Sequence, residues 1–322
     1  MPNVRQLADV PELDEYCVSK VTTMGHVLEV TTRKKNTAGS PCRKLDKDHY
    51  LDLRTGEVLE YNHIENRSES TRSIRNTLAR IRALVNTNVT QPNAVRWVTL
   101  TYAENMTDTR RLYEDYFKFW KRFSYWCKKN GFEKPEYITV QEPQGRGAWH
   151  VHAFFIWPGE APYIDNNQVM QKLWGHGFTK VKALHDCDNI GAYFSAYLGD
   201  MPLEEVQRLP EAEKEKALSG ATVLEKEFTD EQERTKTKKF VKGGRLYLYP
   251  PGMNIVRTTK GIKQPEVEVM TLSEAKEKVS SAKLTYSCAY EIIGDDGTTQ
   301  NLITKSYYNR KRTQNATGNS IG

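Results

Sequence analysis

The sequence predicts an α+β protein with a central antiparallel sheet and flanking helices. Runs of β-branched and aromatic residues at 96–102, 137–140 and 149–157 are typical of strands. Apolar residues recur at helical spacing over 70–86 and again after Asp108. The last two strands are separated by a short glycine-containing turn, and strands joined in this way pair antiparallel.

Composition narrows the class of protein. The 322 residues allow two domains, or one large domain with insertions. With 38% hydrophobic and 27% charged residues, no run approaches the roughly 18 apolar residues of a spanning helix, so we expect no membrane partner. Residues 1–5 lead into no apolar segment, so we expect no secretory signal. The five scattered cysteines form no CxxC pair, which argues against a disulfide framework or zinc ribbon and indicates a cytoplasmic protein.

The first elements are weakly marked. Residues 1–48 predict irregular structure or short strands. Alternating apolar residues over 51–61, with Gly56 between them, predict a β-hairpin. The next helix, 70–86, has one apolar face with spacings of 4, 3 and 4. Its arginines lie mostly off that face, where solvation and contact with DNA phosphates are equally consistent with the pattern.

A longer helix begins after Asp108, a residue type that caps helix N-termini, and ends near Gly131. Its aromatic residues recur at spacings of 4 and 3. The stripe favours a buried face, and the alternative is base stacking beside the neighbouring lysines and arginines. Strand 137–140, a turn at 144–147 and strand 149–157 follow.

The second half predicts a helix over 166–174 and another over 189–198, with Asp188 as a candidate cap. Charged residues fill 18 of the 38 positions in 203–240, which predicts exposed helix and linker. Residues 245–252 predict strand and turn. The basic end, 308–322, lacks apolar periodicity and predicts disorder.

His150 and His152 are the centre of the chemistry. Residues i and i+2 of a strand point to one face, so both imidazoles project together. The turn at 144–147 brings the carboxylate of Glu142 beside them. Two histidines and one carboxylate leave open positions on a catalytic metal and suit Mn²⁺, with Mg²⁺ as the alternative. A lone HxH also arises by chance in strands.

Tyr193 and Tyr197 are four residues apart, so they share one face of the predicted helix. A phenol with a pKa near 10 is a poor nucleophile at neutral pH. Beside a metal-bound phosphate it becomes an effective one, because the metal withdraws charge from the phosphorus. Taken alone, the pair is more typical of an amphipathic core helix than of a catalytic site.

Three ordered motifs resemble those of rolling-circle replication initiators, the Rep proteins of plasmids and single-stranded DNA phages in the HUH endonuclease superfamily. The motifs are Thr99-Leu100-Thr101-Tyr102, Glu142-Pro143-Gln144 leading to Gly147-Ala148-Trp149-His150-Val151-His152, and Tyr193 with Tyr197. The resemblance is closest to Rep proteins of small elements from Gram-positive bacteria. It covers 96–200 and extends back to Leu45 and forward to Gly261.

The resemblance implies a fold and a role for each residue. The fold is an antiparallel core similar to an RNA-recognition motif. Glu142, His150 and His152 match metal ligands, Tyr193 matches the nucleophile, and Tyr197 matches the second tyrosine of some members. Residues 66–264 become the nicking and DNA-binding domain with a charged insert at 203–240, between an N-terminal region, 1–65, and a C-terminal region, 265–322.

One position departs from the family pattern. Many relatives have a lysine three residues after the nucleophilic tyrosine, where this chain has Ala196. The candidates to replace its charge are Arg146, Lys180 and Lys182, and Thr101 and Tyr102 are the further expected DNA contacts. The departure also leaves open which tyrosine attacks.

The implied activity is origin-specific nicking and rejoining of single-stranded DNA through a 5′-phosphotyrosyl link. The expected partners are origin DNA, a separate helicase and a host DNA polymerase, in the cytoplasm of a bacterium. We expect no nucleotide cofactor, since no GxxxxGK[ST] motif is present. The alternatives are a relaxase, a single-tyrosine transposase, a metal-dependent hydrolase that uses water, and a non-catalytic nucleic-acid-binding module.

Overall fold

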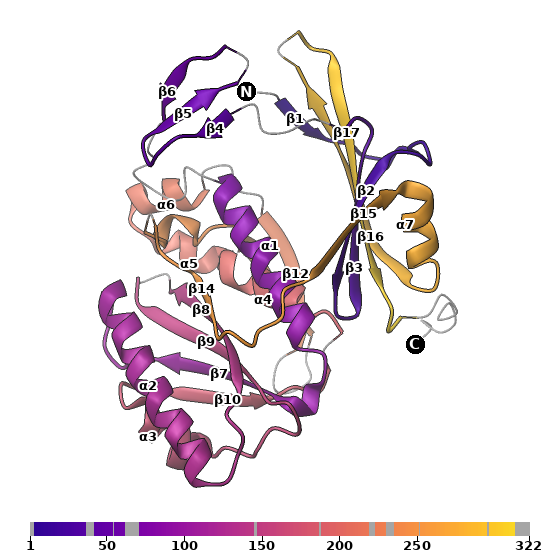
Figure 1. Cartoon of the computed structure of the whole chain (residues 1–322). Helices are drawn as coiled ribbons and strands as arrows, with labels where there is room; N and C mark the ends of the chain where they lie inside the picture. Colours follow the sequence, from indigo (N-terminus) through magenta and orange to yellow (C-terminus); the bar gives the residue numbers. More distant parts are fainter. Residues whose placement is uncertain are drawn as a thin grey trace. The chain divides into compact units, whose positions relative to one another are not determined.

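The computed structural model describes residues 3–36, 42–53, 55–61, 71–144, 147–186, 188–218, 223–229, 235–250, 252–294 and 296–312 (Figure 1). The chain divides into two compact units. One combines Met1–Ile64 with Pro265–Gly322, and the other is Glu65–Gln264. Helices and several antiparallel sheets occur together, which confirms the predicted α+β class.

A five-stranded sheet forms the centre of the 65–264 unit, in the order β10-β7-β9-β8-β14, and every neighbouring pair is antiparallel. Its strands are β7 (Val95–Thr101), β8 (Glu136–Pro143), β9 (Trp149–Ile156), β10 (Thr179–Ala183) and β14 (Val256–Thr258). The middle strand β9 is buried on both faces, which explains its nearly continuous apolar sequence.

One face of this sheet is covered by α2 (Thr109–Lys129), which begins as predicted after Asp108. The Asp108 carboxylate accepts hydrogen bonds from two backbone N–H groups of the first turn. Phe123 packs against Phe155 of β9, with ring centroids 4.7 Å apart. The helix expected over 166–174 is a π-helical turn, Asn166–Met170, followed by α3, Gln171–Trp174.

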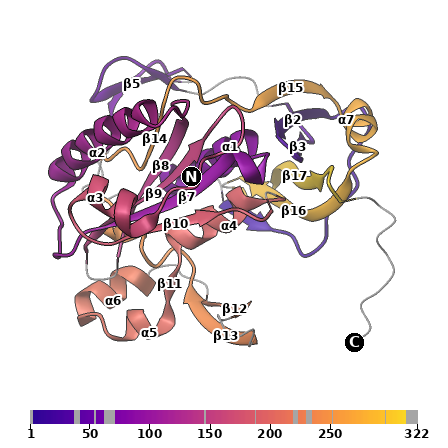
Figure 2. The ribbon, with the colours of Figure 1, turned by 90° about the horizontal axis from the view of Figure 1, so that it is seen from below.

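The opposite face is covered by α4 (Ile190–Gly199), and Figure 2 shows α2 and α4 on opposite sides of the sheet. The α4 helix packs against α1 (Thr71–Asn88), where the N–H of Gly191 donates to Asn86 Oδ1 over 2.8 Å. The expected cap, Asp188, is not the N-cap. That position is Asn189, whose side-chain oxygen accepts from Asn86 instead of capping the helix.

The charged segment contains helix, as expected, and also a β-hairpin that was not expected. It contains α5 (Leu203–Gln207), α6 (Glu211–Leu218) and a hairpin of β12 (Val223–Thr229) with β13 (Thr235–Val241), which also pairs with β11 (Met201–Pro202). The strand predicted in 245–252 is wrong, because Leu246–Leu248 form a 3-10 turn.

The other unit is built on a six-stranded sheet in the order β1-β16-β17-β3-β2-β15. Strands from both ends of the chain alternate in it: β1 (Asn3–Gln6), β2 (Val18–Met24), β3 (Val27–Arg33), β15 (Glu266–Thr271), β16 (Lys283–Ile293) and β17 (Thr299–Asn309). Short strands are present before residue 48, as in the four-residue β1, but β2 and β3 are longer than expected, at seven residues each.

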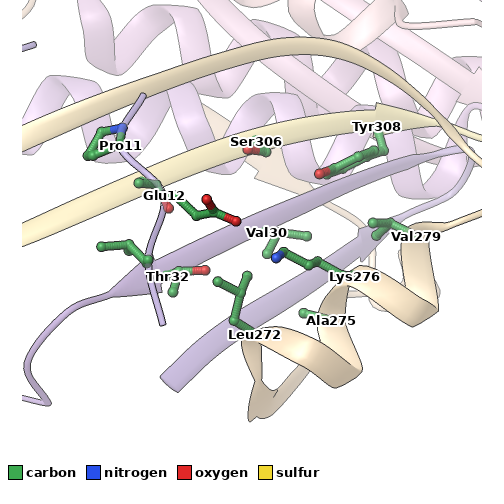
Figure 3. A pocket seen from close by; sticks show the side chains of 12 residues that line it. Pro11, Glu12, Val30, Thr32, Leu272, Ala275, Lys276, Val279, Ser306 and Tyr308 are labelled. Carbon is green, nitrogen blue, oxygen red and sulfur yellow. The ribbon is translucent and has the colours of Figure 1, made fainter. Parts of the chain in front are cut away.

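A helix, α7 (Leu272–Val279), packs on this sheet and begins with a capping box between Thr271 and Glu274. A cavity of about 190 Å³ lies between helix and sheet, with Glu12 from the N-terminal segment and Lys276 from α7 among its lining (Figure 3). A separate small sheet contains β4 (Cys42–Lys44), β5 (His49–Asp52) and β6 (Val58–Glu60). Its β5–β6 pair is the predicted hairpin, and Gly56 adopts a φ of 75° in the turn.

Candidate metal centre

The strand register brings Glu142, His150 and His152 together. Glu142 of β8 lies directly opposite His150 of β9, so their side chains share one face of the sheet. His152 is two residues further along β9 and points to the same face. The short connection between β8 and β9 thus places residues eight to ten positions apart in one cluster.

The three side chains form a compact donor group. Their ligand atoms all lie within 4.8 Å of one another. His152 Nε2 is 2.5 Å from Glu142 Oε2, and the other ring nitrogen, Nδ1, is 3.2 Å from the hydroxyl of Thr99. Glu142 and His152 are buried, whereas His150 is half-buried. Although His150 is half-buried as a residue, its Nε2 atom is buried.

This donor group fits a divalent metal ion. Two imidazoles and one carboxylate are three of the ligands that transition metals prefer, and three protein ligands leave open positions. The contact of Thr99 with Nδ1 orients the His152 ring so that Nε2 faces the carboxylate, as the second partner of a ligating histidine usually does. The group can bind a metal ion by these criteria.

A buried carboxylate needs a compensating charge, and Arg245 supplies it. Its guanidinium contacts Glu142 Oε1 through one nitrogen and Glu205 Oε2 through another, the latter at 3.2 Å. Sequence reasoning missed Arg245 and Glu205 as site residues. Since 103 positions separate Arg245 from Glu142, no local spacing connects them.

The helix with the two tyrosines lies on the same face of the sheet. Phe194 of α4 packs against the His152 ring, with centroids 5.6 Å apart, and against Trp97 at 5.5 Å. Tyr193 and Tyr197 belong to this helix. Their side chains lie outside the described residues. The fold therefore places the helix of the two tyrosines beside the metal centre, and the phenolic oxygens are outside the part of the chain that the structure describes.

Three of the five expected DNA contacts also lie on this face. Thr101 is opposite His150, and Lys180 is opposite Thr99 on the edge strand β10. Lys182 follows two residues later, with its Nζ 5.6 Å from the centre of the Trp97 ring. Both lysines are exposed. Arg146 lies outside the described residues.

Tyr102 does not fit the expected role of a DNA contact. Its side chain is 2% exposed and belongs to the main hydrophobic core. The hydroxyl donates to Asp115 Oδ2 over 3.2 Å, and burial together with the nearby Asp115 charge raises the Tyr102 pKa. Tyr102 comes directly after the last residue of β7, and its ring packs into the hydrophobic core. The ring is therefore inaccessible to nucleic acid.

An open groove of about 610 Å³ lies beside the end of β8. Gln144 and Gly147 line it from the β8–β9 connection, and Glu205 and Arg208 line it from the segment after α4. Glu205, one of the two ion-pair partners of Arg245, is thus also part of an accessible surface.

The central part of the chain is similar to a known protein family. Residues 95–201 match the family model described as replication-associated protein ORF2/G2P. The match covers about a third of the chain, from β7 to the end of α4, and contains Glu142, His150 and His152. It supports a replication-associated role and an interaction with DNA. No curated protein and no solved structure matches the chain.

Across the described ranges, no helix is both long and apolar enough to cross a membrane.

Proposed function

We propose that this chain is an origin-specific DNA nicking and rejoining enzyme of the HUH superfamily that initiates rolling-circle replication. One observation carries the proposal. The Glu142–His150–His152 group lies under the helix of Tyr193 and Tyr197, inside the segment that matches a replication-associated family. A binding module would need neither the clustered metal donors nor the tyrosine helix beside them.

In this proposal Glu142, His150 and His152 hold a divalent ion, Mn²⁺ or Mg²⁺. When bound, the ion would polarise the scissile phosphate and stabilise charge on its oxygens. Thr99 keeps the His152 ring in the ligating orientation, and Arg245 compensates the Glu142 charge. Mn²⁺ suits the mixed imidazole and carboxylate set better than Mg²⁺ does.

Tyr193 attacks the phosphorus. A bond forms between its phenolic oxygen and the phosphorus, the bond to the 3′ oxygen breaks, and the phenolic proton is released while the leaving oxygen gains one. The products are a 5′-phosphotyrosyl protein and a free 3′-OH, which a polymerase extends. Because one phosphodiester replaces another, a later 3′-OH reverses the exchange without ATP. Tyr197 is the candidate for a second attack.

Charge supports DNA as the substrate. Residues 65–264 contain 31 lysines and arginines against 24 acidic residues, so the excess positive charge of the chain lies in this unit. Lys180 and Lys182 are exposed on the face of the metal centre. We assign them to phosphate contacts with the single strand, where lysine acts as a point charge.

The proposal is tested by cleavage of a single-stranded oligonucleotide from the origin of the element that encodes the protein, with and without Mn²⁺. We expect site-specific cleavage that needs the metal and falls at least 100-fold in His152→Ala. His49→Ala is the matched control, because His49 lies in the small β4–β6 sheet. Binding without cleavage on a verified origin, or cleavage unaffected by His152→Ala, would refute the proposed chemistry.

A further inference from the structure

Arg245 connects three parts of the 65–264 unit. Its side chain, 13% exposed, contacts Glu142 of β8 and Glu205 of α5. Its backbone N–H donates to the carbonyl oxygen of Gly199, the last residue of α4, over 3.2 Å. The same residue therefore meets the carboxylate of the metal centre and the end of the tyrosine helix.

Local sequence explains why Arg245 lies there. Gly243 adopts a φ of 77°, and its N–H donates to Asp200 Oδ1 over 3.1 Å. A Cβ on Gly244 would come 3.0 Å from the Met201 Cβ, so glycine favours this close approach to the residues after α4. The Gly243–Gly244 turn thus fixes the backbone of Arg245 against the C-terminal end of α4.

The contacts divide the two oxygens of Glu142 between different partners. Oε1 meets the guanidinium of Arg245, and Oε2 faces His152 Nε2. A planar guanidinium with several fixed donors holds a carboxylate in one orientation. Glu205 occupies a second nitrogen of the same guanidinium and limits its rotation.

We propose that Arg245 is a positioning residue, oriented by Glu205, that holds Glu142 so that Oε2 faces the two histidines and ligates the metal. The inference rests on the proposed metal site. Because Glu205 balances the added positive charge, the pair orients Glu142 at little electrostatic cost to cation binding. Neither Arg245 nor Glu205 lies in the segment that matches the replication-associated family.

The test is the affinity of the full chain for Mn²⁺, measured by calorimetry and by the electron paramagnetic resonance of bound Mn²⁺. We expect Arg245→Met to weaken binding by tenfold or more, in the range found when the outer partners of metal ligands are removed. Arg245→Lys keeps the charge without the planar fork, and its affinity is expected to stay well below that of the wild type. Glu205→Gln is expected to weaken binding severalfold.

Arg257→Met is the matched control. This arginine is exposed on β14, 4.8 Å from the centre of the Tyr113 ring, and the variant should bind Mn²⁺ as the wild type does. Glu205 acts through Arg245 in our proposal, so Arg245→Met with Glu205→Gln should bind no more weakly than Arg245→Met alone.

The outcomes separate the two proposals. A wild-type chain that binds no Mn²⁺ overturns the metal site itself. A wild type that binds Mn²⁺, with variants of unchanged affinity or with additive losses in the double variant, overturns the positioning role and leaves the metal site standing. Thermal unfolding checks that each variant is folded. If Arg245→Met does not fold, Arg245→Lys and Glu205→Gln decide the question.

Discussion

Among single residues, His152 has contacts to both of its ring nitrogens and to the ring itself. Glu142 meets one ring nitrogen, Thr99 meets the other, and Phe194 packs against the ring. The ring therefore has one orientation before any ligand binds. Pre-orientation of this kind lowers the entropy lost when the site takes up an ion.

Thr99→Val tests this pre-orientation. Valine has nearly the volume of threonine but makes no hydrogen bond to Nδ1, so the ring gains rotational freedom. We expect a Mn²⁺ affinity about tenfold weaker, measured by calorimetry. Thr139→Val on β8 is a suitable control, because the Thr139 hydroxyl donates to the Arg257 carbonyl on β14. Equal affinity in wild type and Thr99→Val would contradict the role of Thr99.

Tyr116 offers a prediction on stability. Its side chain is buried, and within the described part of the chain its hydroxyl makes no hydrogen bond. A buried hydroxyl without a partner costs free energy, so Tyr116→Phe should raise the free energy of unfolding by about 1 kcal/mol. Tyr102→Phe should lower it by a similar amount, because Tyr102 donates to Asp115. Chemical denaturation of the wild type and both variants measures the change in the free energy of unfolding. A Tyr116→Phe variant less stable than the wild type would contradict the prediction for Tyr116.

Site residues that lie close together in the sequence could be predicted. Glu142, His150 and His152 lie on strands joined by a short turn, so alternation alone placed them on one face. Arg245 reaches Glu142, and Glu205 reaches Arg245, only through tertiary packing of segments that carried no sign of the site in their sequence. The burial of Tyr102 also depends on packing, since a tyrosine at a strand end is equally typical of a surface.

At the scale of elements, α4 is positioned by α1 and by the sheet. The N–H of Gly191 donates to Asn86, and a Cβ on Gly191 would lie 2.5 Å from the carbonyl oxygen of Arg82. A side chain at this position would force α1 and α4 apart. Gly191, in the first turn of α4, thus allows the tyrosine helix to lie over the metal centre.

Gly191→Ala is therefore expected to destabilise the protein by about 1–3 kcal/mol, the usual cost of overpacking, and to reduce cleavage by displacing α4. Gly159→Ala is the control, because a Cβ there meets no atom within 4 Å. Thermal unfolding and cleavage of the two variants are compared side by side. Wild-type stability and activity in Gly191→Ala would contradict the close approach of the helices.

Elements with strong periodicity were predictable, and those defined by distant pairing were not. The aromatic stripe and the Asp108 cap identified α2 from local sequence. The six-stranded sheet escaped detection because β1 pairs with β16, and Arg5 and Glu291 lie 286 positions apart. Strands β2 and β3 also place valine and threonine on both faces, which weakens the alternation that indicates a strand.

At the scale of the whole molecule, buried tyrosines make stability sensitive to alkaline pH. Burial raises the pKa of Tyr102 and Tyr116 above the ordinary value, and burial beside Glu213 raises that of Tyr247 to about 12. A group whose pKa is raised on folding stabilises the fold below its unfolded pKa, about 10 for tyrosine, and loses that contribution as pH rises further.

We therefore expect the free energy of unfolding to fall between pH 10 and pH 11, by about 1 kcal/mol for each fully buried tyrosine, because the unfolded tyrosine is already half ionised at pH 10. Denaturant unfolding at both pH values measures the loss. The Tyr116→Phe variant should lose less than the wild type, which separates the tyrosine contribution from that of lysines titrating in the same range. Equal losses in both proteins would speak against the raised Tyr116 pKa.

The most direct test of the proposed function is to identify the covalent link. The protein is incubated with a single-stranded origin oligonucleotide and Mn²⁺, denatured in SDS and digested, and the DNA-bound peptide is identified by mass spectrometry. We predict an adduct on Tyr193 that is lost in Tyr193→Phe and persists in Tyr197→Phe. Cleavage of a verified origin without an adduct on either tyrosine would contradict the proposed chemistry.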